Sequence, residues 1–143
     1  MGLETGPTVL LVDDQAKVRA SLRGMLEEEG ITVIGEARDG DSAVEAVSEL
    51  NPDVVLMDLR MPTMNGIDAT RAIRRVRPET QVVVLTAYDD AALRERLQRV
   101  RAYTYLVKGC APGDVIDAVM AAWSLRQRMR DGCPPSPPAF SGA

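Results

Sequence analysis

The sequence predicts an α/β protein in which helices cover both faces of a parallel sheet, and two observations indicate this. Apolar runs rich in β-branched residues have the length of strands that are buried on both faces. These runs occupy residues 8–12, 54–57, 82–85 and 103–107. Segments with helical periodicity lie between the strands, so that strand and helix alternate five times. Crossovers of about 20 residues are long enough for right-handed connections, which place helices on both faces.

The first half of the chain carries clear boundary signals. After the first strand, apolar residues recur three and four positions apart until Gly30, a typical helix stop. Residues 32–37 alternate loosely and predict a second strand. Ser42 to Glu45 fits a capping box, which predicts that the second helix begins there. Pro52 ends this helix before the third strand.

The second half predicts three more helices. Asn65-Gly66 is a turn signal, and helical spacing follows it as far as Pro78. The next helix has a thinner apolar stripe, made of Leu93, Leu97 and Val100. Pro112 suits the first turn of the last helix. The apolar side of this helix is predicted to contain Val115, Ile116, Val119, Met120 and Trp123.

These elements predict one domain over residues 1–131. The expected closure is a five-stranded, doubly wound sheet of the flavodoxin-like kind, with strand order 2-1-3-4-5. Residues 132–143 contain four prolines between positions 134 and 138. We expect this segment to be an extended or disordered tail, or the stub of a linker.

Composition excludes several kinds of function. The 143 residues carry a net charge of −4, which offers no electrostatic basis for nucleic-acid binding. The chain has no histidine and two cysteines, which argues against a zinc site, a histidine-based triad and a disulfide framework. No signal peptide or apolar run of about 20 residues is visible, so we expect a cytoplasmic protein without membrane contact.

Polar side chains follow four of the predicted strands: Asp13 and Asp14, then Asp58, Thr86 and Lys108. Because the carboxyl ends of parallel strands meet at one edge of the sheet, these side chains should converge. Three adjacent carboxylates repel one another, and a divalent cation removes that conflict. Oxygen ligands favour Mg²⁺, which binds one or two carboxylates together with a phosphate.

This set of residues is suited to phosphoryl transfer. Asp58 can act as a nucleophile and form an aspartyl-phosphate. The metal and Lys108 would neutralise the charge on the transferring group, and the Thr86 hydroxyl can donate to a phosphoryl oxygen.

The chain resembles the receiver domains of response regulators, the phosphoacceptors of two-component signalling. The resemblance extends over residues ~8 to ~128. Its motifs are Val12-Asp13-Asp14, Leu56-Met57-Asp58-Leu59-Arg60-Met61-Pro62, Asn65-Gly66, Leu85-Thr86-Ala87 and Tyr105-Leu106-Val107-Lys108. Residues 35–40 and 57–62 further resemble the NarL-like branch, whose members usually carry a C-terminal helix-turn-helix.

The resemblance assigns a role to each site residue. It implies that a sensor histidine kinase phosphorylates Asp58. It also implies that Asp14, Asp58 and the backbone carbonyl of Arg60 bind Mg²⁺ directly, while Asp13 acts mainly through water.

It further implies that Thr86 and Lys108 bind the phosphoryl oxygens. Tyr105 would be an aromatic switch that turns inward when Thr86 moves. The readout face would be formed by the fourth helix, the fifth strand and the fifth helix, which could also form a homodimer. The expected output is control of transcription through an effector domain or partner, with autodephosphorylation and no turnover of an external substrate.

Three departures from the family pattern stand near the last strand, and one of them is Thr104, where glycine is common. Val100-Arg101-Ala102 replaces residues that are usually small, which argues against the usual flexibility of this loop. Gly109 follows Lys108 where a proline is common.

Other readings of the same residues are open. Asp13 and Asp14 could be helix caps, Lys108 a solvated charge and Tyr105 an ordinary strand aromatic. Four arginines are expected to form a solvated face, with a partner surface as the alternative: Arg94, Arg96, Arg99 and Arg101.

Two other functions compete with the signalling switch. One is a haloacid-dehalogenase-like phosphatase, in which the nucleophile precedes the acidic pair, whereas here the pair comes first. The other is a pseudo-receiver that binds partners without phosphorylation, against which the complete set of site residues argues.

Overall fold

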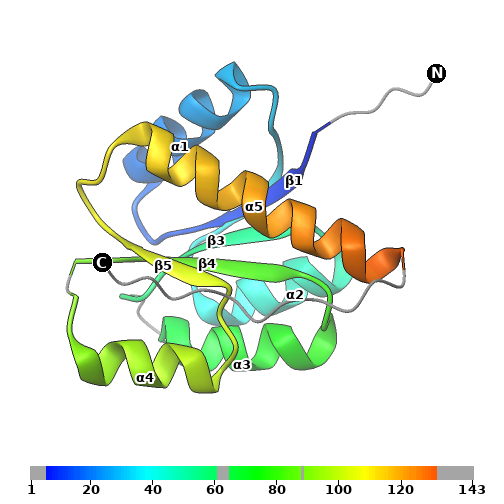
Figure 1. Cartoon of the computed structure of the whole chain (residues 1–143). Helices are drawn as coiled ribbons and strands as arrows, with labels where there is room; N and C mark the ends of the chain where they lie inside the picture. Colours follow the sequence, from blue (N-terminus) through cyan, green and yellow to red (C-terminus); the bar gives the residue numbers. More distant parts are fainter. Residues whose placement is uncertain (1–5, 61–64, 88, 132–143) are drawn as a thin grey trace.

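Five parallel strands form a sheet that lies between two layers of helices (Figure 1). The computed structural model describes residues 6–60, 65–87 and 89–131. The strands are β1 (Thr8–Val12), β2 (Thr32–Ala37), β3 (Val54–Asp58), β4 (Gln81–Thr86) and β5 (Thr104–Val107). The helices are α1 (Ala16–Glu28), α2 (Gly40–Leu50), α3 (Gly66–Val76), α4 (Ala91–Arg99) and α5 (Pro112–Arg130). The strand order is β2-β1-β3-β4-β5, which confirms the predicted topology.

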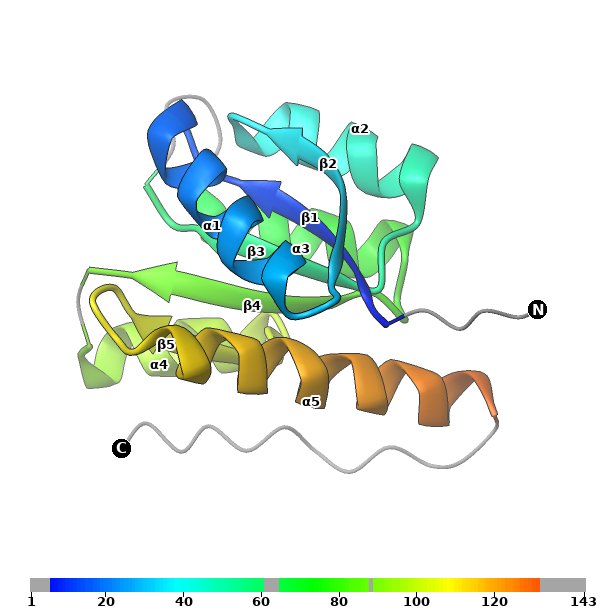
Figure 2. The ribbon, with the colours of Figure 1, turned by 90° about the horizontal axis from the view of Figure 1, so that it is seen from above.

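The two helix layers explain why the strand runs are apolar without interruption. Helices α1 and α5 cover one face of the sheet, while α2, α3 and α4 cover the other (Figures 1 and 2). Successive residues of a strand point to opposite faces, so both sets of positions are buried. In β3, Val55 and Met57 pack toward α2, α3 and α4, whereas Val54 and Leu56 pack toward α1 and α5.

Side-chain caps define where three of the helices begin. The carboxylate of Asp39 accepts a hydrogen bond from the Ser42 backbone N–H at 2.8 Å, so α2 begins at Gly40. The predicted capping box at Ser42 is therefore wrong, because an acceptor three residues earlier already satisfies that N–H. Asn65 and Asp90 cap α3 and α4 in the same way.

Helix α5 begins at Pro112 as predicted, but its buried side differs from the prediction. Met120 is 38% exposed and lies off the buried stripe, so its assignment to the core side was wrong. The buried residues are Val115, Val119, Ala122, Leu125 and Arg126. A charged residue thus ends an otherwise apolar stripe.

Arg126 connects α5 to the amino-terminal edge of the sheet. Its Nη1 donates to the carbonyl of Pro52 at 2.7 Å and to Oδ1 of Asp53 at 2.9 Å, and its Nη2 donates to Oδ1 of Asn51 at 2.9 Å. Oδ2 of Asp53 accepts from the backbone N–H and the hydroxyl of Thr8. Burial lowers the pKa of Arg126, and Asp53 opposes that effect. One buried ion pair therefore joins α5, β1 and the approach to β3.

Arg101, one of the departures from the family pattern, lies just after the end of α4 in a conformation that is strained for a residue other than glycine. Arg101 has φ of 63°, which is the left-handed conformation that glycine adopts most easily. Its N–H donates to the carbonyl of Gln98, and the N–H of Ala102 donates to that of Leu97. This is the hydrogen-bond pattern of a Schellman motif, which favours glycine at the left-handed position.

Replacing Arg101 by glycine is expected to stabilise the domain. Relief of the left-handed strain contributes roughly 1–2 kcal/mol, and the greater freedom of the unfolded chain offsets about 0.4–1 kcal/mol of it. We expect the free energy of unfolding, measured by urea titration with circular dichroism, to rise by about 0.5–1 kcal/mol. Arg96→Gly inside α4 is the matched control and should lower it by about 1 kcal/mol. Destabilisation by both substitutions would contradict the strain argument.

Within the described residues, no helix combines the length and the apolar character that crossing a bilayer requires. The predicted tail at residues 132–143 lies outside the described part of the chain.

Candidate functional site

The carboxyl ends of the strands bring the predicted acidic residues together. Carboxylate oxygens of Asp13, Asp14 and Asp58 all lie within 4.8 Å of one another. Asp13 and Asp58 are buried, at 3% and 4% exposed, whereas Asp14 is open to solvent. This convergence arises because β1 and β3 are neighbours, with Val12 paired to Met57 at their ends. The structure therefore confirms that these three residues share one edge of the sheet.

Lys108 approaches Asp58 from the end of β5, two strands away. Its Nζ lies 3.0 Å from Oδ1 of Asp58, and its own side chain is 34% exposed. The backbone N–H of Lys108 donates to the carbonyl of Thr86 at 2.7 Å, which aligns the ends of β4 and β5. Gly109 follows with φ of 97°, a conformation that the proline ring cannot adopt. Lys108 is thus an ion-pair partner and not a solvated charge.

The start of α3 packs directly on the backbone beside Asp58. The N–H of Gly66 donates to the carbonyl of Leu59 at 3.0 Å. A Cβ atom on Gly66 would lie 2.8 Å from the carbonyl oxygen of Asp58. Any larger residue at position 66 would therefore force the backbone at the end of β3 to shift. The backbone N–H of Arg60 lies 3.3 Å from Oδ1 of Asp58. The motif residues Met61 and Pro62 lie outside the described residues.

The environment of Asp13 favours a bound cation. Burial raises the pKa of Asp13, and the neighbouring carboxylates of Asp58 and Asp14 raise it further. The Gln15 N–H, which donates to Asp13 at 2.8 Å, and the charge of Lys108 act in the opposite direction. Helix α1 begins after Gln15 without a side-chain cap, so the helix-cap reading of Asp13 and Asp14 is wrong.

The donor atoms fit Mg²⁺ by their chemistry. Among the described residues, the three carboxylates supply oxygen ligands only, and Lys108 compensates one of their negative charges. Oxygen-only sets with few protein ligands are typical of Mg²⁺, which retains several waters.

Removing one carboxylate is expected to stabilise the metal-free protein. Because the folded-state pKa of Asp13 is raised, its ionised form opposes folding. This penalty is absent below the unfolded-state pKa, develops as the pH rises from that value to the folded-state pKa, and is complete above it. Asp13→Asn should therefore increase the free energy of unfolding at neutral pH in EDTA, and the difference from wild type should shrink on acidification.

The same substitution should weaken the response to Mg²⁺. At ten times its Kd, Mg²⁺ would stabilise the wild type by about 1.4 kcal/mol, and the variant should gain less at the same concentration. Asp117→Asn on the exposed side of α5 serves as the control. An unchanged response to Mg²⁺ in Asp13→Asn would contradict the role of Asp13.

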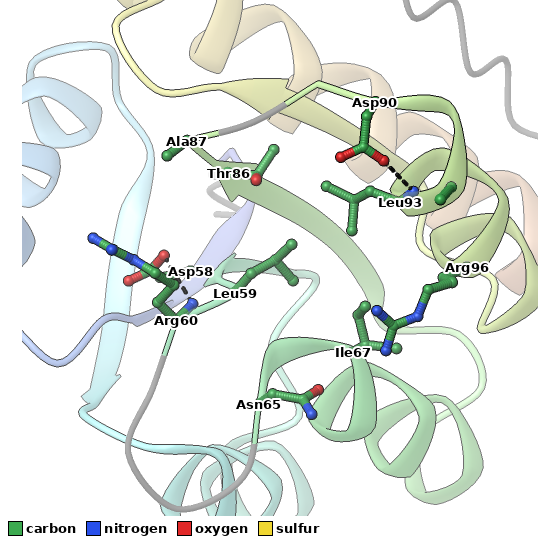
Figure 3. Close-up of a pocket in the computed structure, with 11 residues that line it drawn as sticks. Asp58, Leu59, Arg60, Asn65, Ile67, Thr86, Ala87, Asp90, Leu93 and Arg96 are labelled. Carbon is green, nitrogen blue, oxygen red and sulfur yellow. Dashed lines mark hydrogen bonds between the residues drawn. The ribbon is translucent and has the colours of Figure 1, made fainter.

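A pocket of roughly 440 Å³ opens beside the acidic cluster (Figure 3). Asp58 and Thr86 contribute to its lining, and Arg96 and Asn65 lie on the side near α3. Its apolar lining residues are Leu59, Ile67, Ala87, Ala92 and Leu93. The pocket lies between α3 and α4 and extends to Asp58 at the carboxyl end of β3.

Tyr105 is buried in the core on the α4 side of the sheet and is 7% exposed. Its hydroxyl donates to Oδ1 of Asp89 at 2.5 Å and accepts from Nε of Arg94 at 3.2 Å. Burial raises the pKa of Tyr105, the bond to Asp89 raises it further, and Arg94 opposes both. Arg94 is intermediate in exposure, with 38% of its side chain exposed, so it lies at the helix surface and also contacts Tyr105.

Sequence reasoning missed two polar contacts that the fold creates. Val119 and Arg126 are seven residues apart, about two helical turns, and therefore lie on the same face of α5. This spacing could have identified Arg126 as a buried arginine. For Asp89 and Arg94, no local signal indicates that both reach Tyr105, because the contact joins two elements.

Comparison with known proteins agrees with this geometry. The sequence profile of the response regulator receiver domain matches residues 9–120. The response regulator UvrY of Escherichia coli K12 is 41% identical over 117 residues, which cover 81% of this chain and 54% of UvrY. The chain therefore spans about half the length of that relative.

Solved structures show the same fold. The signal receiver domain of a NarL response regulator from Mycobacterium tuberculosis is 29% identical, with a TM-score of 0.80 over 85% of this chain and 98% of that one. A chain of the CheX–CheY–BeF3–Mg²⁺ complex from Borrelia burgdorferi is also 29% identical, with a TM-score of 0.76 over 81% of this chain and 88% of that one.

Proposed function

The chain belongs to the response regulator receiver domain family, and on this basis we propose that Asp58 accepts a phosphoryl group from a sensor histidine kinase. Receiver domains are phosphorylation-dependent signalling switches and not turnover enzymes. The observation that carries the proposal is the ion pair between Nζ of Lys108 and the Asp58 carboxylate at 3.0 Å, beside two further carboxylates.

A Mg²⁺ ion fits this site. Asp14, Asp58 and the carbonyl of Arg60 would bind it directly, with Asp13 acting through water. The ion would offset negative charge on the phosphoryl oxygens. The complex from B. burgdorferi, whose name includes BeF3 and Mg²⁺, supports this assignment by similarity of fold and sequence.

The side chains of this protein would then act as follows. A carboxylate oxygen of Asp58 attacks the phosphorus, a P–O bond forms, and the P–N bond to the kinase imidazole breaks. The leaving imidazole retains the electron pair and takes up a proton. Lys108 and the Thr86 hydroxyl bind the phosphoryl oxygens, which requires Lys108 to release part of its contact with Asp58. Hydrolysis of the aspartyl-phosphate would return the switch to its resting state.

The readout is proposed for the face formed by α4, β5 and α5. Val107 on β5 and Met120 on α5 are large apolar side chains that are 36% and 38% exposed, which supports a surface for a partner or a second copy. Since the chain spans about half of UvrY, control of transcription through an effector region is part of the proposal. A kinase partner also implies a cytoplasmic location.

Phosphorylation by a small donor tests the proposal directly. Acetyl phosphate and Mg²⁺ are added to the protein, and intact-mass spectrometry follows the uptake of one phosphoryl group. We expect uptake that EDTA prevents, together with negligible release of nitrophenol from p-nitrophenyl phosphate. Rapid turnover of that ester would favour the phosphatase, and absence of any uptake would favour the pseudo-receiver.

A further inference from the structure

The hydroxyl of Tyr105 lies between two charged side chains that come from a different part of the chain. It donates to Oδ1 of Asp89 at 2.5 Å and accepts from Nε of Arg94 at 3.2 Å. Nη2 of Arg94 lies 3.6 Å from the same Asp89 oxygen, so the three groups close a triangle. We refer to Asp89, Arg94 and Tyr105 as the tyrosine clamp.

Burial gives the clamp its strength. Tyr105 is 7% exposed, and a buried tyrosine hydroxyl requires hydrogen-bond partners. Both partners carry a charge, and such hydrogen bonds are shorter and stronger than those between neutral groups. The side chains of Arg94 and Asp89 are 38% and 39% exposed, so their direct ion pair contributes little alone. The main contribution therefore comes from the bonds to the tyrosine hydroxyl.

The clamp also connects the Asp58 site to α4. Asp89 lies in the segment that follows Thr86, and the next residue, Asp90, caps α4 through the N–H of Leu93 at 2.8 Å. Arg94 belongs to the first turns of α4. A single oxygen atom on β5 thus contacts both Asp89, which precedes α4, and Arg94 in the first turns of α4.

We propose that Asp89 and Arg94 are positioning residues that hold the Tyr105 ring in its buried orientation, and that they thereby increase the affinity of the site for a phosphoryl group. This role rests on the proposed function of Asp58. Movement of the ring to solvent would break the hydroxyl contacts with both residues and release the start of α4. Without the clamp, more conformations of Asp89 and of the start of α4 would compete with the one that binds phosphate.

Beryllofluoride, a phosphoryl mimic, provides the test. Its Kd in the presence of Mg²⁺ is measured for the wild type and for Asp89→Ala, Arg94→Ala and Tyr105→Phe. Each substitution should raise the Kd by about three- to tenfold. In the Tyr105→Phe background, Asp89→Ala and Arg94→Ala should add little, because the hydroxyl they act through is gone.

Matched variants separate the clamp from general effects on α4. Arg99→Ala removes an exposed ion pair with Glu95 (3.4 Å) on the same helix and should leave the Kd unchanged. Arg94→Lys retains a cationic donor and should restore much of the affinity lost in Arg94→Ala. Equal effects of Asp89→Ala in both backgrounds, or equal effects of Arg94→Ala and Arg99→Ala, would overturn the proposal.

A second measurement keeps this proposal distinct from the function of Asp58. In protein with ¹³C-labelled tyrosine rings, the Tyr105 signal is assigned by its loss in Tyr105→Phe and recorded without metal or beryllofluoride. Asp89→Ala and Arg94→Ala should shift this signal toward that of a solvated ring, and an unmoved signal would refute the clamp. A wild type that does not bind beryllofluoride would refute the proposed function, while the signal would still test the clamp.

Discussion

Asp58→Asn is expected to abolish phosphoryl uptake from acetyl phosphate in the presence of Mg²⁺. The amide has nearly the same shape as the carboxylate, but it lacks the negative charge of the nucleophile and of a metal ligand. Since Asp58 is 4% exposed and its Oδ1 contacts Lys108, a neutral side chain also leaves that ammonium without its partner. The rate of uptake should fall on the order of 100-fold or more. Intact-mass spectrometry of both proteins over the same time course measures the loss.

An exposed aspartate on α3 provides the control for this experiment. Asp68 pairs with Arg71 on the helix surface at 3.2 Å, and Asp68→Asn should phosphorylate like the wild type. Circular dichroism should show that both variants are folded. If Asp58→Asn still took up one phosphoryl group, a different residue would be the acceptor and the assignment of the site would be wrong.

Arg126→Met is expected to lower the free energy of unfolding by about 3–5 kcal/mol, because it leaves a buried charge on Asp53 without its partner. The methionine retains much of the apolar stem, so the loss measures the guanidinium and its hydrogen bonds. Those hydrogen bonds include one to the Asn51 side chain and one to the Pro52 carbonyl. Urea unfolding followed by circular dichroism gives the value.

Two further variants show whether the buried pair is the cause. Arg128→Met removes an exposed arginine of the same helix, whose contact is Ser124 at 3.3 Å, and should change the stability by less than about 0.5 kcal/mol. Adding Asp53→Asn to Arg126→Met should recover part of the loss, since the unpaired charge is then removed. Similar losses for Arg126→Met and Arg128→Met would show that the pair at the sheet edge is unimportant.

The acidic site follows from a local pattern. An apolar run such as Val54 to Met57 is buried on both faces because each of its alternating side chains is apolar, and the polar residue after it must therefore lie at the sheet edge. Hence the position of Asp58 at the carboxyl end of a central strand is predictable from the amino-acid sequence. The local capping pattern failed at Ser42, because the Asp39 carboxylate accepts the hydrogen bond from the Ser42 backbone N–H and caps α2 three residues earlier.

The amino-acid sequence was sufficient to predict the order of strands and helices, the parallel sheet and the edge at which Asp13, Asp14, Asp58, Thr86 and Lys108 gather. Those features depend on the periodicity of apolar residues and on chain connectivity, and both can be read directly from the amino-acid sequence. Only the folded chain reveals that Lys108 reaches Asp58, that Asp89 and Arg94 hold Tyr105, and that Arg126 ends in a buried ion pair. Each of these contacts joins side chains from different elements, so its existence depends on distances and burial that the packing of those elements establishes.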